Sequence, residues 1–205
     1  MSTGNDIVAL TMMDGDRTSR YRFYSRILSP AELPLYDELA DGGLSFSSFV
    51  WLMWSIKESV YKYVSRSDRR LVFTPLKIPV SGLRAREDYC EGEIPYGGLT
   101  IYSRSFLSDE AIMTVVSEEK EFSDSRWGLQ VIGDLGYNNQ SDQVRTFALQ
   151  SLSTVLPGAA LRIVKAPDGP PEVWDGDCPL DIPLSLAHHG RYVAWSYRLP
   201  ANSSS

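Results

Sequence analysis

Hydrophobic residues recur at helical spacing in two stretches of the chain. The first runs from Leu44 to about Tyr63, and the second begins after Ser141, a plausible N-cap, and stops at Pro157-Gly158. Each stripe predicts one buried helix face, formed by Phe49, Met53, Ile56, Val60 and Tyr63 in the first helix and by Val144, Phe147, Ala148, Leu152 and Val155 in the second. Each half of the chain therefore contains one amphipathic helix.

Two charged residues of the first helix lie away from its apolar stripe. Glu58 and Lys62 are four residues apart, so their side chains stack on the same side of the helix, as a solvated ion pair would. Upstream, Ser29 stands at a plausible N-cap with Pro30 at the first helical position and Glu32 at the third. This capping box predicts the start of a shorter helix and gives Glu32 a structural role.

Short apolar runs bounded by proline, glycine and aspartate predict strands elsewhere. Residues 6–10 read as a buried strand with Asp6 at its start. An antiparallel meander is predicted at 71–80, 99–106 and 111–118, and two hairpins are predicted from 160–166 with 171–174 and from 182–187 with 192–199, turning at 167–170 and 188–191. Helices and antiparallel strands in each half predict an α+β fold.

The segment of residues 117–141 is polar and mixed in composition, and it predicts a long connection between two parts of the chain. We place a domain boundary within it. The predicted domains are residues 1–120 and 121–205.

Composition and charge narrow the class of protein. The 205 residues are 43% apolar and 22% charged, which is enough to bury a core, and the net charge of −6 argues against a nucleic-acid partner. The first residues lack a basic region, and no later stretch is apolar enough to span a bilayer, so we expect a cytoplasmic protein without a membrane partner. Cys90 and Cys178 are too few for a disulfide framework and lack the spacing of a zinc or redox site.

The residues alone give little chemistry. Asp6 and Glu58 are far apart in sequence, yet two converging carboxylates are what Mg²⁺ requires. His188 and His189 are adjacent, so on an extended segment they point to opposite faces and make poor joint metal ligands. Phosphate-binding, nucleophile-elbow and dinucleotide motifs are missing from the sequence. The residues alone therefore indicate an α+β protein with a candidate metal site and no more specific function.

Four sequence blocks add a specific resemblance. Residues 54–62, WSIKESVYK, closely resemble the W-[ST]-x-K-E-[AS]-x-x-K signature of 4′-phosphopantetheinyl transferases, and residues 4–8, GNDIV, resemble their G-x-D-I strand. Arg22-Phe23 with residues 28–32, LSPAE, is similar to the family's R-F…L-[ST]-x-x-E segment. Residues 185–192, SLAHHGRY, are similar to its S-x-[ST]-H-x-G-R-[WY] motif.

The order of these blocks carries its own implication. Two-lobed members of the family have the histidine motif in the first half, whereas here it lies near the end of the chain. The resemblance therefore implies two similar lobes, each an antiparallel sheet packed with helices, in a pseudo-dimer with the lobe order permuted. The alternative is an enlarged member of the short, homotrimeric holo-acyl-carrier-protein synthase class. In both cases the active site is expected in the cleft between two lobes.

The resemblance also implies roles for single residues. Asp6 and Glu58 would ligate Mg²⁺, and Lys62 would reach a phosphate of coenzyme A. Glu32 aligns with the glutamate proposed as general base in two-lobed members. Its role in the capping box is the alternative. The further cofactor contacts implied are His188 at the 3′-phosphate, Arg191 beside it, Arg22 and Lys165.

The implied activity is Mg²⁺-dependent transfer of 4′-phosphopantetheine from coenzyme A to a serine of an apo carrier protein, releasing adenosine 3′,5′-bisphosphate. The basic stretch from Arg17 to Arg26 would dock the carrier's acidic helix, against the alternative of a solvated loop. Three positions depart from the family pattern: Val8 replaces a third carboxylate, Ala187 replaces a hydroxyl residue, and Gly169-Pro170-Pro171 replaces Gly-Lys-Pro. They leave open a degenerate coenzyme A-binding module; a metal-dependent phosphohydrolase is a further alternative.

Overall fold

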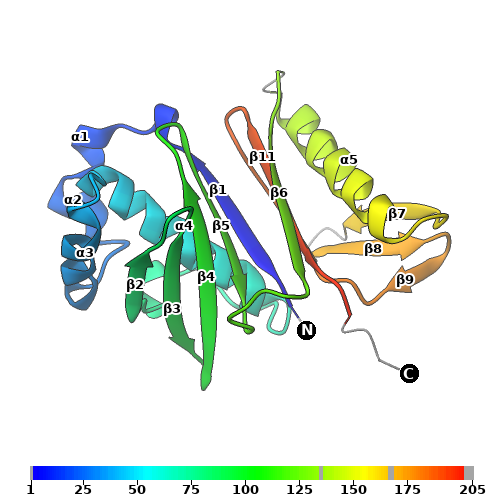
Figure 1. Ribbon diagram of the computed structural model, residues 1–205, viewed down its shortest axis with the longest axis horizontal. Coiled ribbons are helices and arrows are strands. Elements are labelled where there is room, and N and C mark those ends of the chain that lie inside the picture. The colour runs from blue at the N-terminus through cyan, green and yellow to red at the C-terminus, as the bar shows by residue number, and fades with distance from the viewer. Residues whose placement is uncertain (1, 134–135, 166–168, 201–205) are drawn as a thin grey trace.

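The protein is described by a computed structural model, which covers residues 2–133, 136–165 and 169–200. It confirms an α+β fold with antiparallel sheets. Figure 1 shows a larger part, with helices α1 to α4, and a smaller part that carries α5. Among the helices of the described residues, none is both long and apolar enough to cross a membrane.

The larger part is built on a five-stranded sheet and the long helix α4 (Phe46–Ser65). The strands lie in the order β1 (Gly4–Ala9), β5 (Ala111–Ser117), β4 (Leu99–Leu107), β3 (Cys90–Tyr96) and β2 (Gly82–Ala85). The apolar stripe of α4 is buried against this sheet, as its spacing predicts. Shorter elements complete this part: η1 (Leu10–Met12), α1 (Gly15–Thr18), α2 (Tyr21–Tyr24), η2 (Pro30–Tyr36), α3 (Asp37–Ala40) and η3 (Pro75–Lys77).

A close approach between β1 and α4 depends on Gly4. A Cβ atom at Gly4 would lie 2.1 Å from the carbonyl oxygen of Ser59 and 2.9 Å from the backbone nitrogen of Tyr63. Only glycine lets the two backbones come this close. The first glycine of the G-x-D-I block therefore sets the distance between the strand that carries Asp6 and the helix that carries Glu58 and Lys62.

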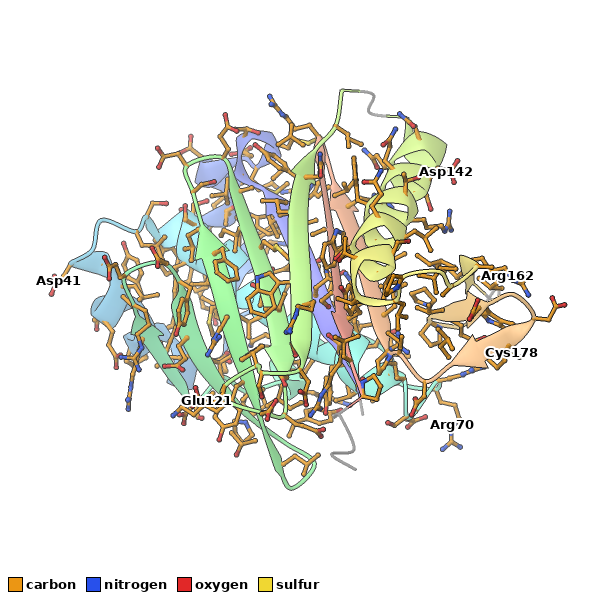
Figure 2. The ribbon with its side chains drawn as sticks, turned by 45° about the vertical axis from the view of Figure 1, so that its right-hand side comes forward. Asp41, Arg70, Glu121, Asp142, Arg162 and Cys178 are labelled. Carbon is orange, nitrogen blue, oxygen red and sulfur yellow. The ribbon has the colours of Figure 1, made fainter. Side chains whose placement is uncertain are left out.

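The smaller part holds two three-stranded sheets and the helix α5 (Tyr137–Val155). One sheet has the order β10 (Leu184–His189), β11 (Tyr192–Arg198), β6 (Ser125–Val131), and the other β7 (Leu161–Lys165), β8 (Pro171–Asp175), β9 (Cys178–Leu180). Figure 2 shows Arg162 and Cys178 on the second of these sheets, at the opposite end of the molecule from Asp41. Cys178 is exposed and Cys90 is buried in β3, and both are free thiols.

The two parts meet along β1. Its edge opposite β5 faces β10 and β11, beside which it runs in Figure 1. The backbone N–H of Asn5 donates to the hydroxyl of Ser185 at 3.1 Å, and the hydroxyls of Thr3 and Ser196 lie 2.9 Å apart. An apolar cluster contains residues of both parts: Ile7, Ala9, Ala111, Met113, Val115, Phe122, Ala187, Tyr192 and Ala194. The parts therefore pack through a shared core.

Several sequence expectations need correction. Residues 71–80 form no strand, because Pro75 and Pro79 lack the N–H groups that a ladder needs, and they contain the short helix η3 instead. The expected connection at 117–141 contains β6 and the start of α5, which begins at Tyr137 rather than after Ser141. The two histidines belong to β10, so the hairpin turns at Gly190-Arg191.

The other expectations are confirmed, incomplete or still untested. Strands at 99–106 and 111–118 and both late hairpins are confirmed, whereas β2, β3 and β9 were missed. Residues 167 and 168 of the turn expected at 167–170 lie outside the described residues. The division into residues 1–120 and 121–205, and the relation of the two parts as similar lobes, stay predictions.

Candidate functional site

Asp6 and Glu58 converge on the ammonium group of Lys62. The Lys62 Nζ atom lies 3.2 Å from Asp6 Oδ1 and 3.4 Å from Glu58 Oε1, and it also donates to the backbone oxygen of Asn5 at 3.0 Å. One cation thus touches two carboxylates that are more than fifty residues apart in the chain. The structure brings together the three residues that the sequence motifs single out.

The packing of β1 on α4 explains this convergence. Gly4 and Asp6 are two residues apart on β1, so both face the helix. Glu58 and Lys62 are one helical turn apart on α4, with Ser59 between them against Gly4. The side chain of Lys62 spans the remaining gap to Asp6.

The electrostatics of the group are those of a half-buried cluster. Asp6 is 5% exposed, and burial raises its pKa to about 6, with Glu58 adding to the rise and Lys62 opposing it. Burial by itself lowers the pKa of Lys62. The two carboxylates together have a larger, opposite effect, so the pKa of Lys62 is raised overall. The cluster carries two negative charges and one positive charge when all three groups are ionised.

The oxygen atoms of this cluster fit a hard divalent cation. The second carboxylate oxygen of Asp6, Oδ2, is buried, and no hydrogen-bond partner for it occurs in the described part of the chain. The Glu58 side chain is 27% exposed, which leaves room for water. Mg²⁺ is commonly held by one or two carboxylates and completed by water and phosphate oxygens.

A third protein ligand is not evident. Val8, two residues after Asp6, is 2% exposed and supplies no donor. In the described ranges, no three His, Cys, Asp or Glu side chains come together as a metal-binding group. Asp6 and Glu58 are thus the two carboxylates that could hold a metal in the part of the chain described here, in line with the departure at Val8.

Next to the cluster lies a cationic cleft of about 320 Å³, lined by α4, β10 and the start of β8. Four basic residues line it, namely Lys62, Arg66, Arg69 and Lys165. The Arg66 guanidinium donates to the backbone oxygens of Leu184 and Pro171, and its burial lowers its pKa to about 10. This cleft suits a ligand with several negative charges.

Arg66 and Arg69 were not foreseen as site residues. They follow Lys62 by four and seven residues and lie just beyond the end of α4 at Ser65. Their positive charge and their closeness to Lys62 in the chain were the signal available in the sequence. The sequence could not show that the end of α4 meets β8 and β10.

The two histidines are consecutive residues of β10, so their side chains point to opposite faces of the strand. Burial lowers the pKa of His188, and the nearby charges of Lys62, His189 and Lys165 lower it further. The Nδ1 atom of His189 accepts the backbone N–H of Ala9 at 3.4 Å. Burial lowers the pKa of His189 as well, while Glu58 opposes this. His189 therefore ties β10 to β1, a role that its assignment to the turn had missed.

Glu32 is not part of this cluster, and its partner on α4 is Lys57. Its carboxylate is 2% exposed and forms a 2.8 Å salt bridge with Lys57, which is itself fully buried. It also accepts the backbone N–H groups of Ser29 and Val80 at 2.8 and 2.9 Å. These contacts are those of the capping box with an added ion pair, and they favour the structural reading of Glu32.

The remaining predicted residues lie outside the cleft. Arg17, Arg20, Arg22 and Arg26 surround Phe23 in a separate hollow of about 300 Å³ on α1 and α2. Arg22 is therefore grouped with the expected docking surface. Arg191 is exposed at the β10–β11 turn, with its guanidinium 5.9 Å from the ring centre of Tyr192.

Comparisons with known proteins identify the family. A search of curated proteins finds no significant match to the chain. A model of the 4′-phosphopantetheinyl transferase superfamily matches residues 2–112, which is more than half of the chain and includes Asp6, Glu58 and Lys62. The chain therefore belongs to the 4′-phosphopantetheinyl transferase superfamily.

Proposed function

We propose that this protein transfers the 4′-phosphopantetheine arm of coenzyme A to a serine of an apo carrier protein in a Mg²⁺-dependent reaction. The observation that carries the proposal is the junction at Lys62, where the Asp6–Glu58 pair borders the cationic cleft. A carboxylate pair beside several cations is what a pyrophosphate and its metal require. Family membership supports the same reaction.

In this proposal Asp6 and Glu58 would hold Mg²⁺, which when bound would neutralise charge on the pyrophosphate of coenzyme A. The unpartnered Oδ2 atom of Asp6 supports this assignment. The serine oxygen of the carrier attacks the phosphorus next to the pantetheine arm. The bond from that phosphorus to the bridging oxygen breaks, and adenosine 3′,5′-bisphosphate leaves. The serine proton passes to solvent water, and the departing phosphate keeps the electron pair of the broken bond.

The cleft would hold the phosphates of coenzyme A. Lys62 would bind the pyrophosphate, and Arg66, Arg69, Lys165 and His188 would surround the remaining negative charge. The departure at Gly169-Pro170-Pro171 removes a lysine that the family pattern expects. Arg69 and Lys165 line the same cleft and supply positive charge in its place.

The carrier protein would dock on the hollow around Phe23. Arg17, Arg20, Arg22 and Arg26 present four cations on one surface, which suits the acidic helix of a carrier. The Arg17 guanidinium also lies 5.6 Å from the centre of the Phe23 ring, so the surface combines charge with an aromatic contact.

The deciding experiment is a transfer assay read by mass spectrometry. The protein is incubated with coenzyme A, Mg²⁺ and several apo carrier proteins, and each carrier is weighed. We expect a gain of one phosphopantetheine, which is lost in Asp6→Ala and Glu58→Ala variants that still fold. Tight binding of coenzyme A without any mass gain would instead support the degenerate binding module, which the departures at Val8 and Ala187 favour.

A further inference from the structure

The ammonium group of Lys62 has a full set of partners inside the protein. It contacts the Asn5 carbonyl oxygen at 3.0 Å, Asp6 Oδ1 at 3.2 Å and Glu58 Oε1 at 3.4 Å. A lysine ammonium has three N–H donors, and three acceptors surround this one. Lys62 therefore occupies the position of a cation shared between the two carboxylates.

We propose that Lys62 is an internal counter-cation, which holds Asp6 and Glu58 together without metal and gives way when a divalent cation binds them. This inference rests on the proposed metal site. A lysine ammonium and a divalent cation close to the same two carboxylates repel each other. Lys62 must then either move or weaken the binding of the metal.

The surroundings of Lys62 give it a place to move. Its side chain is 26% exposed, and it lines the cationic cleft of about 320 Å³ as well as the carboxylate pair. The four-carbon stem of lysine is flexible, so the ammonium can turn from Asp6 into the cleft without movement of α4. There it would meet an anionic ligand. Asp6, by contrast, is fixed in β1, where its neighbours are buried.

This arrangement couples metal binding to anion binding. A metal that displaces Lys62 leaves the ammonium available to the anion, and an anion that attracts Lys62 leaves the carboxylates available to the metal. By linkage, each ligand then raises the affinity for the other by the same factor. Part of this cooperativity would pass through Lys62 rather than through direct metal–anion contact.

The test compares Lys62→Met with Lys165→Met. Both variants remove one positive charge from the lining of the cleft, but Lys165 lies on β7 and not between the carboxylates. Mn²⁺ alone is titrated into each protein, and free Mn²⁺ is followed by electron paramagnetic resonance. We expect Lys62→Met to bind Mn²⁺ about tenfold more tightly than the unmodified protein, and Lys165→Met to change by less than about threefold.

Two further measurements examine the coupling and the metal-free state. In EDTA, Lys62→Met should unfold at a lower temperature than Lys165→Met, because Asp6 and Glu58 then repel each other without a counter-cation. Inorganic pyrophosphate should raise Mn²⁺ affinity less in Lys62→Met than in the unmodified protein. If Lys62→Met is too unstable in EDTA to titrate, Lys62→Gln is used, with the same expectation.

The outcomes separate this inference from the proposed function. Mn²⁺ affinity that stays equal or falls in Lys62→Met overturns the role of Lys62. Asp6→Asn is titrated in parallel. Loss of Mn²⁺ binding in that variant would support the proposed metal site, even if the role of Lys62 is overturned. Unchanged Mn²⁺ binding in Asp6→Asn would overturn the metal site and, with it, both proposals.

Discussion

The side chains of Glu32 and Lys57 form a salt bridge of 2.8 Å in which neither residue is more than 2% exposed. Lys57 also donates to the backbone oxygen of Ile27 at 2.7 Å, and Glu32 accepts the backbone N–H of Val80. The pair therefore connects α4 to two separate segments of the chain. Lys57 stands one residue before Glu58 on α4. The salt bridge therefore also holds α4 in the rotation that presents Glu58.

This pair yields a prediction that distinguishes a structural Glu32 from a general base. Lys57→Met alone leaves the buried carboxylate without its cation and should lower the free energy of unfolding by about 3–5 kcal/mol. Adding Glu32→Gln should recover part of that loss, because glutamine keeps an oxygen for the Val80 N–H. Urea unfolding measures both variants.

The transfer assay then separates the two roles. The double variant should retain most of the activity, since no buried charge is left unpaired. A folded double variant with no activity would instead support Glu32 as the base. Glu93→Gln is a suitable control, because Glu93 and Lys120 form an exposed pair 3.8 Å apart, and its loss should change stability by less than about 1 kcal/mol.

The buried carboxyl of Asp6 predicts a pH dependence of stability. Its pKa is raised from 3.8 to about 6, chiefly by burial, so between these values the folded protein binds a proton that the unfolded chain does not. The contribution of Asp6 to stability is therefore largest below pH 3.8 and is lost as the pH rises through about 6. The loss amounts to about 3 kcal/mol.

Asp6→Asn removes this titration, and the comparison isolates it from the other carboxylates. In metal-free buffer, the unfolding free energy of the unmodified protein should fall relative to that of Asp6→Asn between pH 4.5 and pH 7, by roughly 2 kcal/mol. Urea unfolding at several pH values, with EDTA, gives both curves. Parallel curves would show that the Asp6 carboxyl is not perturbed by burial.

The resemblance to the family's motifs singled out Asp6, Glu58 and Lys62, and the structure brings both carboxylates within 3.4 Å of the Lys62 ammonium group. Their role as a metal and phosphate site stays a prediction. The fold class followed from the two apolar stripes and the alternating segments. These features are local, so a short stretch of chain contains the information that predicts them.

The features that were missed depend on packing between distant segments. The contact of Asn5 with Ser185 joins residues 180 positions apart, and no local pattern reports it. The strand β6 is polar and partly exposed, so its sequence lacks the apolar alternation of a half-buried strand. Arg66 gained its place in the cleft only because α4 ends against β8 and β10.

Gly4 predicts a coupled loss of stability and metal affinity. In Gly4→Ala the new methyl group would meet the Ser59 carbonyl oxygen, so β1 must move away from α4, at a cost of about 1–3 kcal/mol or more. The same movement separates Asp6 from Glu58, and Mn²⁺ should bind more weakly. Gly133→Ala is the matched control, since a Cβ atom there meets nothing within 4 Å. Equal behaviour of the two variants would contradict the close approach.

The proposed docking surface around Phe23 predicts a selective effect on the carrier protein. Arg17→Glu with Arg20→Glu reverses two of the four charges around Phe23 and should raise the KM for the carrier by about tenfold or more at low salt. Affinity for coenzyme A should stay unchanged, because the hollow is separate from the cleft that contains Lys62. Steady-state kinetics with varied carrier, and titration of coenzyme A, measure the two quantities.

The control for this experiment is Arg162→Glu, because Arg162 is exposed on β7 at the far side of the molecule (Figure 2). It reverses one charge without touching α1 or α2, so the KM for the carrier should change little. The effect of the double variant should also shrink as salt is raised, since exposed charges are screened over about 8–10 Å near physiological ionic strength. A KM that is unchanged by Arg17→Glu with Arg20→Glu would remove the docking role from this surface and leave the four arginines as a solvated basic loop.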